Sequence, residues 1–117
     1  MDAADTARFA REWVAAWNAR DVDAVLSHYG DDVVFHSPMI ARVMGDARRS
    51  VRGKAELERY WRTALALIPD LHFEVERVLT GSDALTLLYR NQRGQAVAES
   101  FVFDEAGRVT LSIAAYE

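Results

Sequence analysis

Apolar residues recur every three or four positions in three stretches of the first 68 residues, which is the spacing of amphipathic helices. The pattern predicts three helices, over residues 6–20, 21–30 and 53–68. We expect Asp5 or Thr6 to cap the first helix and Asp21 to cap the second, because these side chains accept hydrogen bonds from free backbone N–H groups. Gly30 should end the second helix in the left-handed conformation, and Pro69 should end the third.

Between the second and third predicted helices the pattern changes. Residues 33–37 combine β-branched and aromatic side chains and predict a short strand, which Pro38 ends because proline cannot donate to a sheet ladder. Residues 39–53 contain two glycines and no sustained period. We therefore expect a long loop there, with a turn or a strand fragment near residues 40–44.

After Pro69, apolar and polar residues alternate in four runs separated by turn sequences, which predicts a four-stranded antiparallel meander. In the first run the apolar phase slips between Val75 and Val78, as it does at a β-bulge, so the sheet should be curved. Alternation places one face of the last strand at Val109, Leu111, Ile113 and Ala115. Three helices followed by a bent sheet predict one α+β domain over residues 1–117, with the helices on one side of the sheet.

The amino-acid composition excludes several classes of function. The 117 residues are 50% hydrophobic and include three Trp, four Tyr and five Phe, enough bulky side chains to fill the core of one domain. No cysteine is present, which excludes disulfides and thiolate metal sites. The acidic first residues and the lack of a long apolar run predict a cytoplasmic protein that does not enter a membrane. A net charge of -4 argues against nucleic acid as a partner.

Several segments carry a likeness to a known family. They are Trp17-Asn18-Ala19-Arg20-Asp21, the run from Tyr29 to Pro38, Arg52-Gly53-Lys54, the run from Phe103 to Val109, and Ala115-Tyr116. Together they resemble the SnoaL-like, ketosteroid-isomerase-like branch of the nuclear transport factor 2-like superfamily. The resemblance implies a cone, in which a curved antiparallel sheet with a mixed edge wraps around three helices and leaves an apolar pocket at its open end. It also implies a homodimer through the outer face of the sheet.

Glu99 is out of place in its strand, because it lies between Val97 and Phe101 on a face that is otherwise apolar. If that face is buried, loss of hydration raises the pKa of Glu99, and the neutral acid can donate a hydrogen bond to a ligand oxygen. Alternatively, the face turns to solvent or Glu99 pairs with Arg90. By the resemblance, Glu99 stands where ketosteroid isomerases carry the protonated aspartic acid of their oxyanion hole.

The other isomerase positions are occupied by different residues. By the resemblance, Trp13 replaces the oxyanion tyrosine and Ser37 replaces the aspartate that acts as general base, with His36 beside it. A serine without a base partner does not abstract a proton from carbon, which puts the isomerase reaction in doubt. Alternation places His36 on the face opposite Phe35 and Ser37, and it remains a secondary candidate.

The resemblance also matches Tyr29 and Trp61 to pocket tyrosines, although their helical spacing equally fits the core. The predicted catalytic residues are Glu99, His36 and Ser37, and the predicted ligand-binding residues are Trp13, Trp17, Tyr29, Phe35, Trp61 and Phe101. No histidine and carboxylate pair has the spacing of metal ligands, and no phosphate loop or dinucleotide fingerprint is present. We therefore expect neither a metal nor a cofactor.

Residues 42–54 are locally basic, with four arginines and Lys54 against Asp46 alone. Such a loop is either solvated and paired with acidic neighbours, or, at the mouth of a cone, able to bind an acidic ligand.

Two functions remain open. In the first, the protein binds a small apolar carbonyl compound and catalyses an isomerase- or cyclase-type proton transfer. In the second, it is a non-catalytic ligand-binding or dimerisation module that has lost the catalytic base.

Overall fold

The computed structural model describes all 117 residues and contains four helices and one six-stranded sheet. The elements are α1 (Ala3–Asn18), α2 (Val22–Leu26), β1 (Tyr29–His36), α3 (Met39–Met44), β2 (Ser50–Arg52), α4 (Lys54–Leu67), β3 (Glu74–Thr80), β4 (Ala84–Arg90), β5 (Ala96–Phe103) and β6 (Val109–Tyr116). The strand order is β2-β1-β6-β5-β4-β3, and β1 runs parallel to β6 while every other pair is antiparallel. The predicted α+β cone with a mixed sheet is confirmed.

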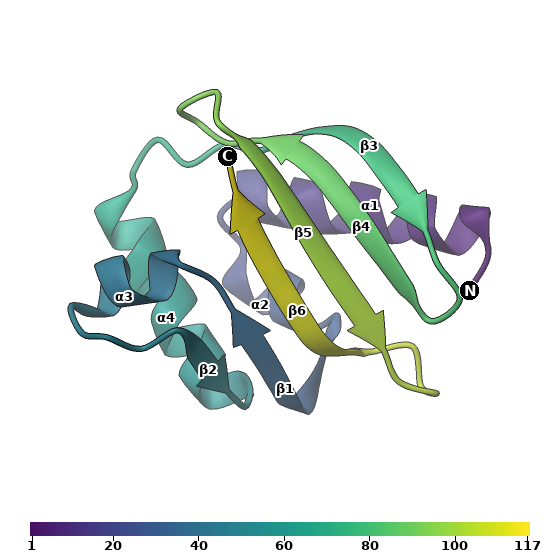
Figure 1. Cartoon of the computed structure of the whole chain (residues 1–117), viewed down its shortest axis with the longest axis horizontal. Coiled ribbons are helices and arrows are strands. Elements are labelled where there is room, and N and C mark those ends of the chain that lie inside the picture. Colours follow the sequence, from purple (N-terminus) through teal and green to yellow (C-terminus); the bar gives the residue numbers. More distant parts are fainter.

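The helices cover one face of the sheet. Figure 1 shows α1 and α2 behind the strands, with α3 and α4 beside the end formed by β1 and β2. A single hydrophobic cluster fills the space between them, with Trp13, Tyr29 and Phe101 among its fully buried side chains. None of the helices is both long and apolar enough to cross a membrane.

Helix α1 begins earlier than predicted. Asp2, not Asp5 or Thr6, is its N-cap, because Asp2 accepts a hydrogen bond from Asp5 N at 2.8 Å while Asp5 accepts one from Asp2 N at 3.1 Å. This reciprocal pair is a capping box. Thr6 is buried instead, and its hydroxyl bonds to that of Thr80 in β3 at 2.8 Å.

The predicted stop at Gly30 is wrong. Helix α2 ends at Leu26, and Tyr29 and Gly30 already belong to β1, where Tyr29 pairs with Val109 of β6. Gly30 does not adopt a positive φ. The periodicity misled here because a core residue at the start of a strand happens to continue the helical spacing.

The predicted loop over residues 39–53 is also wrong. It contains α3, which ends at Gly45 with φ of 72°, and the short edge strand β2. Strand β2 pairs antiparallel with β1, so that His36 lies opposite Ser50. Both elements are shorter than the window that a hydrophobic period needs to become visible.

The meander β3–β6 is confirmed, and so is its bulge, since the pairing of β3 with β4 shifts between Val75 and Arg77. A second shift, between Val102 and Phe103 of β5, was not predicted. Beyond it β6 buries Ser112 and Ala114, whereas Ile113 is 46% exposed. The prediction that Val109, Leu111, Ile113 and Ala115 share one face is therefore wrong: Val109 is buried, whereas Leu111, Ile113 and Ala115 lie on the face opposite Ser112 and Ala114.

Candidate functional site

An apolar cavity of about 230 Å³ opens between the helices and the concave face of the sheet. Aromatic residues of α1, β1, α4 and β4, together with one residue just before β3, form much of its wall: Trp13, Trp17, Phe35, Tyr60, Trp61, Tyr89 and Phe73. An engineered apolar cavity of roughly 150 Å³ accommodates benzene, so this one has room for a substituted ring or two fused rings.

Glu99 lies inside this cavity, and it is 4% exposed. The Tyr89 hydroxyl donates to its Oε1 at 2.9 Å, and the Ser112 hydroxyl donates to its Oε2 at 3.1 Å. Burial raises the pKa of Glu99 to about 7, against the opposing effect of these two donors, which stabilise the carboxylate. Near neutral pH both the neutral acid and the carboxylate of Glu99 are therefore accessible.

The two alternatives for Glu99 do not hold. Its strand face is buried, and Arg90 is engaged elsewhere, with Glu76 at 3.2 Å and Glu117 at 3.7 Å. No positive charge is among the causes that shift the pKa of Glu99. No cation offsets the loss of hydration of this carboxyl group, so burial favours its protonated form, while the two hydroxyl donors oppose that effect only in part.

Two further phenols, of Tyr60 and Tyr116, line the same cavity. Burial raises the pKa of both, that of Tyr116 to about 12, and the charge of Glu99 raises them further. They therefore stay protonated at neutral pH and can donate hydrogen bonds to a ligand. The Ser37 hydroxyl contacts both phenols and partly offsets the rise in their pKa.

The predicted catalytic pair His36 and Ser37 does not line this cavity. Strand pairing places His36 in a row with Ser50 and Ile113 on the outer face of the sheet, whereas Glu99 pairs with Ala114, whose side chain is buried. Ser37 is buried behind the phenols, and its Oγ accepts a hydrogen bond from Met39 N at 3.1 Å. Within the cavity, the structure supplies Glu99 alone as a carboxyl group.

Two predicted ligand-binding residues are core residues. Tyr29 is fully buried outside the lining of the cavity, and its hydroxyl accepts a hydrogen bond from Trp13 Nε1 at 3.1 Å. Phe101 is fully buried as well, with its ring against Phe9 and Trp13. Trp13 therefore contributes its ring surface to the wall, because its N–H is already used. Trp17 Nε1, in contrast, is buried without a hydrogen-bond partner.

Sequence reasoning missed four hydroxyl-bearing residues of the site: Tyr60, Tyr89, Ser112 and Tyr116. Tyr89 could have been found, since it alternates inward with Leu85 and Leu87 on the strand beside Glu99. Ser112 and Tyr116 could not, because the unpredicted register shift turns them inward.

Two arginines line the outer part of the cavity: Arg42 of α3 and Arg93 of the turn between β4 and β5. Of the basic residues in the predicted loop, only Arg42 belongs to the lining. Arg48 instead pairs with Asp46 at 2.8 Å and with Glu56 at 3.5 Å, and Arg49 lies in a separate groove on the outside. His, Asp and Glu side chains form no group of three or more that could hold a metal ion.

Comparisons with known proteins agree with this architecture. The model of the SnoaL-like domain family matches residues 10–112. A SnoaL-like protein of unknown function from Burkholderia thailandensis E264 is 43% identical, with a TM-score of 0.93, over 99% of this chain and 97% of that chain. No functionally curated protein matches the chain.

More distant solved structures share the fold. The crystal structure of TerC, co-crystallised with polyporic acid, has 13% identity and a TM-score of 0.79 over 97% of this chain and 92% of that one. A candidate ketosteroid isomerase from Kribbella flavida has 16% identity and a TM-score of 0.74 over 97% of this chain and 78% of that one. These two likenesses concern the fold alone.

Proposed function

The chain belongs to the SnoaL-like domain family, and from this premise we propose that it binds a small apolar molecule with a carbonyl oxygen in the cavity, where Glu99 donates a hydrogen bond to that oxygen. The observation that carries the proposal is a carboxyl group with a pKa near neutrality, buried in a cavity walled by aromatic rings. Pockets of this kind, apolar with a few convergent polar groups, are the usual form of small-molecule sites.

The position of the polar groups supports a carbonyl ligand. The acid proton of Glu99 and the phenolic protons of Tyr60 and Tyr116 are all donors, and none of these groups is paired with a cation. Trp17 Nε1, in the wall, adds a donor that has no acceptor within the protein. A ligand oxygen that accepts hydrogen bonds fits such a surplus of buried donors.

A second candidate is an isomerase-type proton transfer, favoured by the near-neutral pKa of Glu99, which suits a group that both takes and returns a proton. The Glu99 carboxylate takes a proton from the carbon next to the carbonyl. The electron pair of the broken C–H bond forms a C=C bond, and the oxygen becomes an enolate that Tyr60 and Tyr116 stabilise by hydrogen bonds. Glu99 then returns the proton to carbon, so that atoms and charge balance.

The test uses α-tetralone, a two-ring ketone of suitable size, and the variant Glu99→Gln, which keeps the shape of the side chain. Quenching of Trp13, Trp17 and Trp61 fluorescence reports binding, since all three rings line the cavity. We expect saturable binding by the wild type, which weakens above about pH 7 as Glu99 ionises, and no such pH dependence in the variant. Binding with the same pH profile in both proteins contradicts the role of Glu99.

Hydrogen exchange separates the two candidates. In deuterium oxide, the wild type should accelerate exchange at the carbon beside the carbonyl of α-tetralone, with a rate that rises with pH to a plateau above about 7. Glu99→Gln should abolish the acceleration. Binding without any acceleration contradicts this proton transfer and supports a non-catalytic ligand-binding module.

We also propose that this single-domain protein is cytoplasmic and forms a homodimer. The outer face of the sheet supports the homodimer. Leu79, Val102 and Ile113 are exposed there by 46%, 36% and 46%, and strand pairing aligns Ile113, Ser100, Thr86 and Leu79 in one row across the sheet. Apolar residues gathered on one face are typical of a surface that is covered in an assembly. Sedimentation velocity should show a dimer, and Ile113→Lys should give a folded monomer.

A further inference from the structure

The mouth of the cavity is positively charged, whereas its closed end holds no positive charge. Arg42 and Arg93 are exposed side chains that come from different elements and line the same cavity. Glu99 is the only acidic residue in the lining, and it is buried at the inner end. No ion pair involves Arg42 or Arg93, although Arg48, Arg62 and Arg90 all have carboxylate partners.

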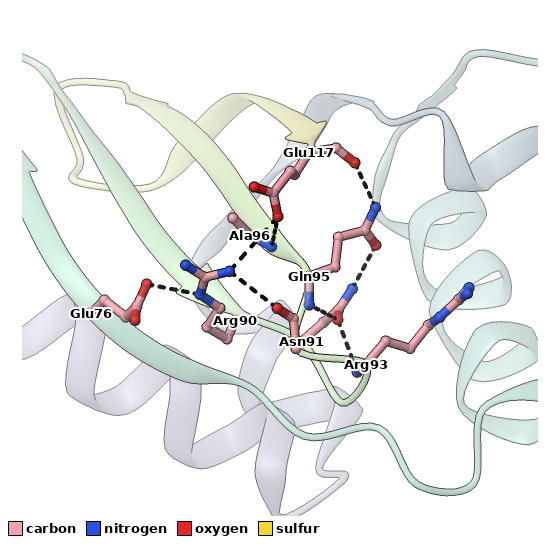
Figure 2. Close-up of polar contacts among 8 residues, drawn as sticks. Glu76, Arg90, Asn91, Arg93, Gln95, Ala96 and Glu117 are labelled. Atoms are coloured by element: carbon pink, nitrogen blue, oxygen red, sulfur yellow. Dashed lines mark hydrogen bonds and ion pairs between the residues drawn. The ribbon is translucent and has the colours of Figure 1, made fainter.

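The turn that carries Arg93 is held in place by side chains. Asn91 Oδ1 accepts hydrogen bonds from the backbone N–H groups of Arg93 and Gln95 at 3.0 and 3.1 Å, and Gln95 Nε2 donates to Glu117 O at 2.8 Å. Arg90 also donates to Gly94 O at 3.1 Å. Figure 2 shows this polar cluster, with the Arg93 side chain pointing away from it. The turn therefore fixes the backbone of Arg93 while its guanidinium group remains free.

Glu117, an acidic residue of this polar cluster, does not neutralise Arg93. The Glu117 carboxylate accepts from Ala96 N at 3.2 Å and pairs with Arg90 at 3.7 Å, as Figure 2 shows. Neither does Glu99, since no arginine contributes to the shift in its pKa. Two positive charges at the mouth thus lack a protein partner, and a guanidinium group binds carboxylates in a planar, two-point geometry.

We propose that the ligand is amphipathic: an apolar ring system whose oxygen meets Glu99 at the closed end and whose carboxylate binds Arg42 and Arg93 at the mouth. The proposal rests on the proposed function and adds the ligand's charge. Glu99 lies three residues along β5 from Ala96, where the strand begins after the turn that carries Arg93, so roughly 10 Å of strand separates Glu99 from that turn. A two-ring ligand with its ketone at one end and its carboxylate at the other fits both this extended shape and the cavity volume of about 230 Å³.

The test compares two probes of the same shape, an α-tetralone with a carboxyl group on its aromatic ring and the primary amide of that acid. Fluorescence quenching gives both dissociation constants for the wild type, Arg42→Gln, Arg93→Gln and the double variant. Arg49→Gln is the matched control, because it removes the same charge from the basic loop but lies outside the cavity. All of these side chains are exposed, so folding should not change.

The wild type should bind the acid about tenfold more tightly than the amide. A tenfold ratio of dissociation constants is about 1.4 kcal/mol, which is the binding free energy expected from one well-placed ion pair or from two weaker ones. Each single variant should lose part of this preference and the double variant all of it, while Arg49→Gln keeps it. Added salt should weaken binding of the acid and leave that of the amide unchanged.

Equal affinity of the wild type for the acid and the amide overturns the proposal, and so does an equal loss in Arg49→Gln. Neither result contradicts the proposed function if the amide still binds and if Glu99→Gln removes the pH dependence of that binding. If neither probe binds, the proposed function and the charged mouth both fail.

Discussion

Replacing Glu99 by Gln should make the protein more stable above pH 7 and remove a pH dependence. Glutamine keeps the size of the side chain, can accept from Tyr89 and can donate to Ser112, but it cannot ionise. The pKa of Glu99 is about 7 in the fold, against 4.5 in the absence of burial. Each pH unit between these values is worth about 1.4 kcal/mol, so ionised Glu99 costs the folded protein about 3 kcal/mol.

The direction follows from proton counts. Between pH 4.5 and about 7 the unfolded chain has released the Glu99 proton while the folded chain still holds it. The unfolded state then binds fewer protons, so the free energy of unfolding falls as pH rises. The stabilising effect of the neutral acid is complete below pH 4.5 and is lost above pH 7. For a protein whose total stability is about 5–15 kcal/mol, this is a large fraction.

The assay is urea unfolding of wild type and Glu99→Gln across this pH range, followed by tryptophan fluorescence. The difference between the two curves is the informative quantity, because it cancels the other titrating groups. His28 is one of these: burial lowers its pKa, so its contribution to stability falls toward low pH, in the opposite direction. We expect the difference to grow by about 3 kcal/mol from acidic to alkaline pH. Curves that stay parallel refute the burial of an ionisable Glu99.

Three further changes test other parts of the structure. Tyr89→Phe removes a donor to the Glu99 carboxylate, so it should raise the pKa of Glu99 above 7, by about one unit, in a pH titration monitored by NMR; an unchanged pKa contradicts the bond. Phe101→Ala should cost about 3–5 kcal/mol in urea unfolding, because its fully buried ring packs on Phe9 and Trp13; a small cost would place it in the cavity wall. Asp2→Ala should cost about 1 kcal/mol by the same assay, through loss of the capping box, whereas no cost means that α1 begins later.

The sequence predicted the long elements well, because their apolar period repeats several times. Helix α4 and the meander β3–β6 were recognised in this way, and the phase slip at Val75 marked the bulge. Short elements were missed, since α3 has six residues and β2 three. A helix of that length is stabilised by its contacts with the rest of the fold and not by a pattern of its own.

At the site, the sequence identified Glu99 because a carboxylate on an apolar face contradicts the pattern around it. It could not identify the partners of Glu99. Tyr89 is a common kind of core residue, and Ser112 lies inward only because the register of β6 shifts by one residue. A single inserted residue reverses the two faces of a strand, and in β6 no phase slip reveals it, because Ile113, Ala114 and Ala115 are all apolar.

The account as a whole depends on contact between the Glu99 acid and a ligand carbonyl, which infrared spectroscopy can observe directly. We would record the carbonyl stretch of isotopically labelled α-tetralone bound to wild type and to Glu99→Leu, at about pH 5 and about pH 9. At the lower pH the wild-type complex should show a band at lower wavenumber than the variant complex, because a hydrogen bond weakens the C=O bond. At the higher pH this difference should shrink as Glu99 ionises. A carbonyl band at the same position in both complexes at the lower pH would contradict the account.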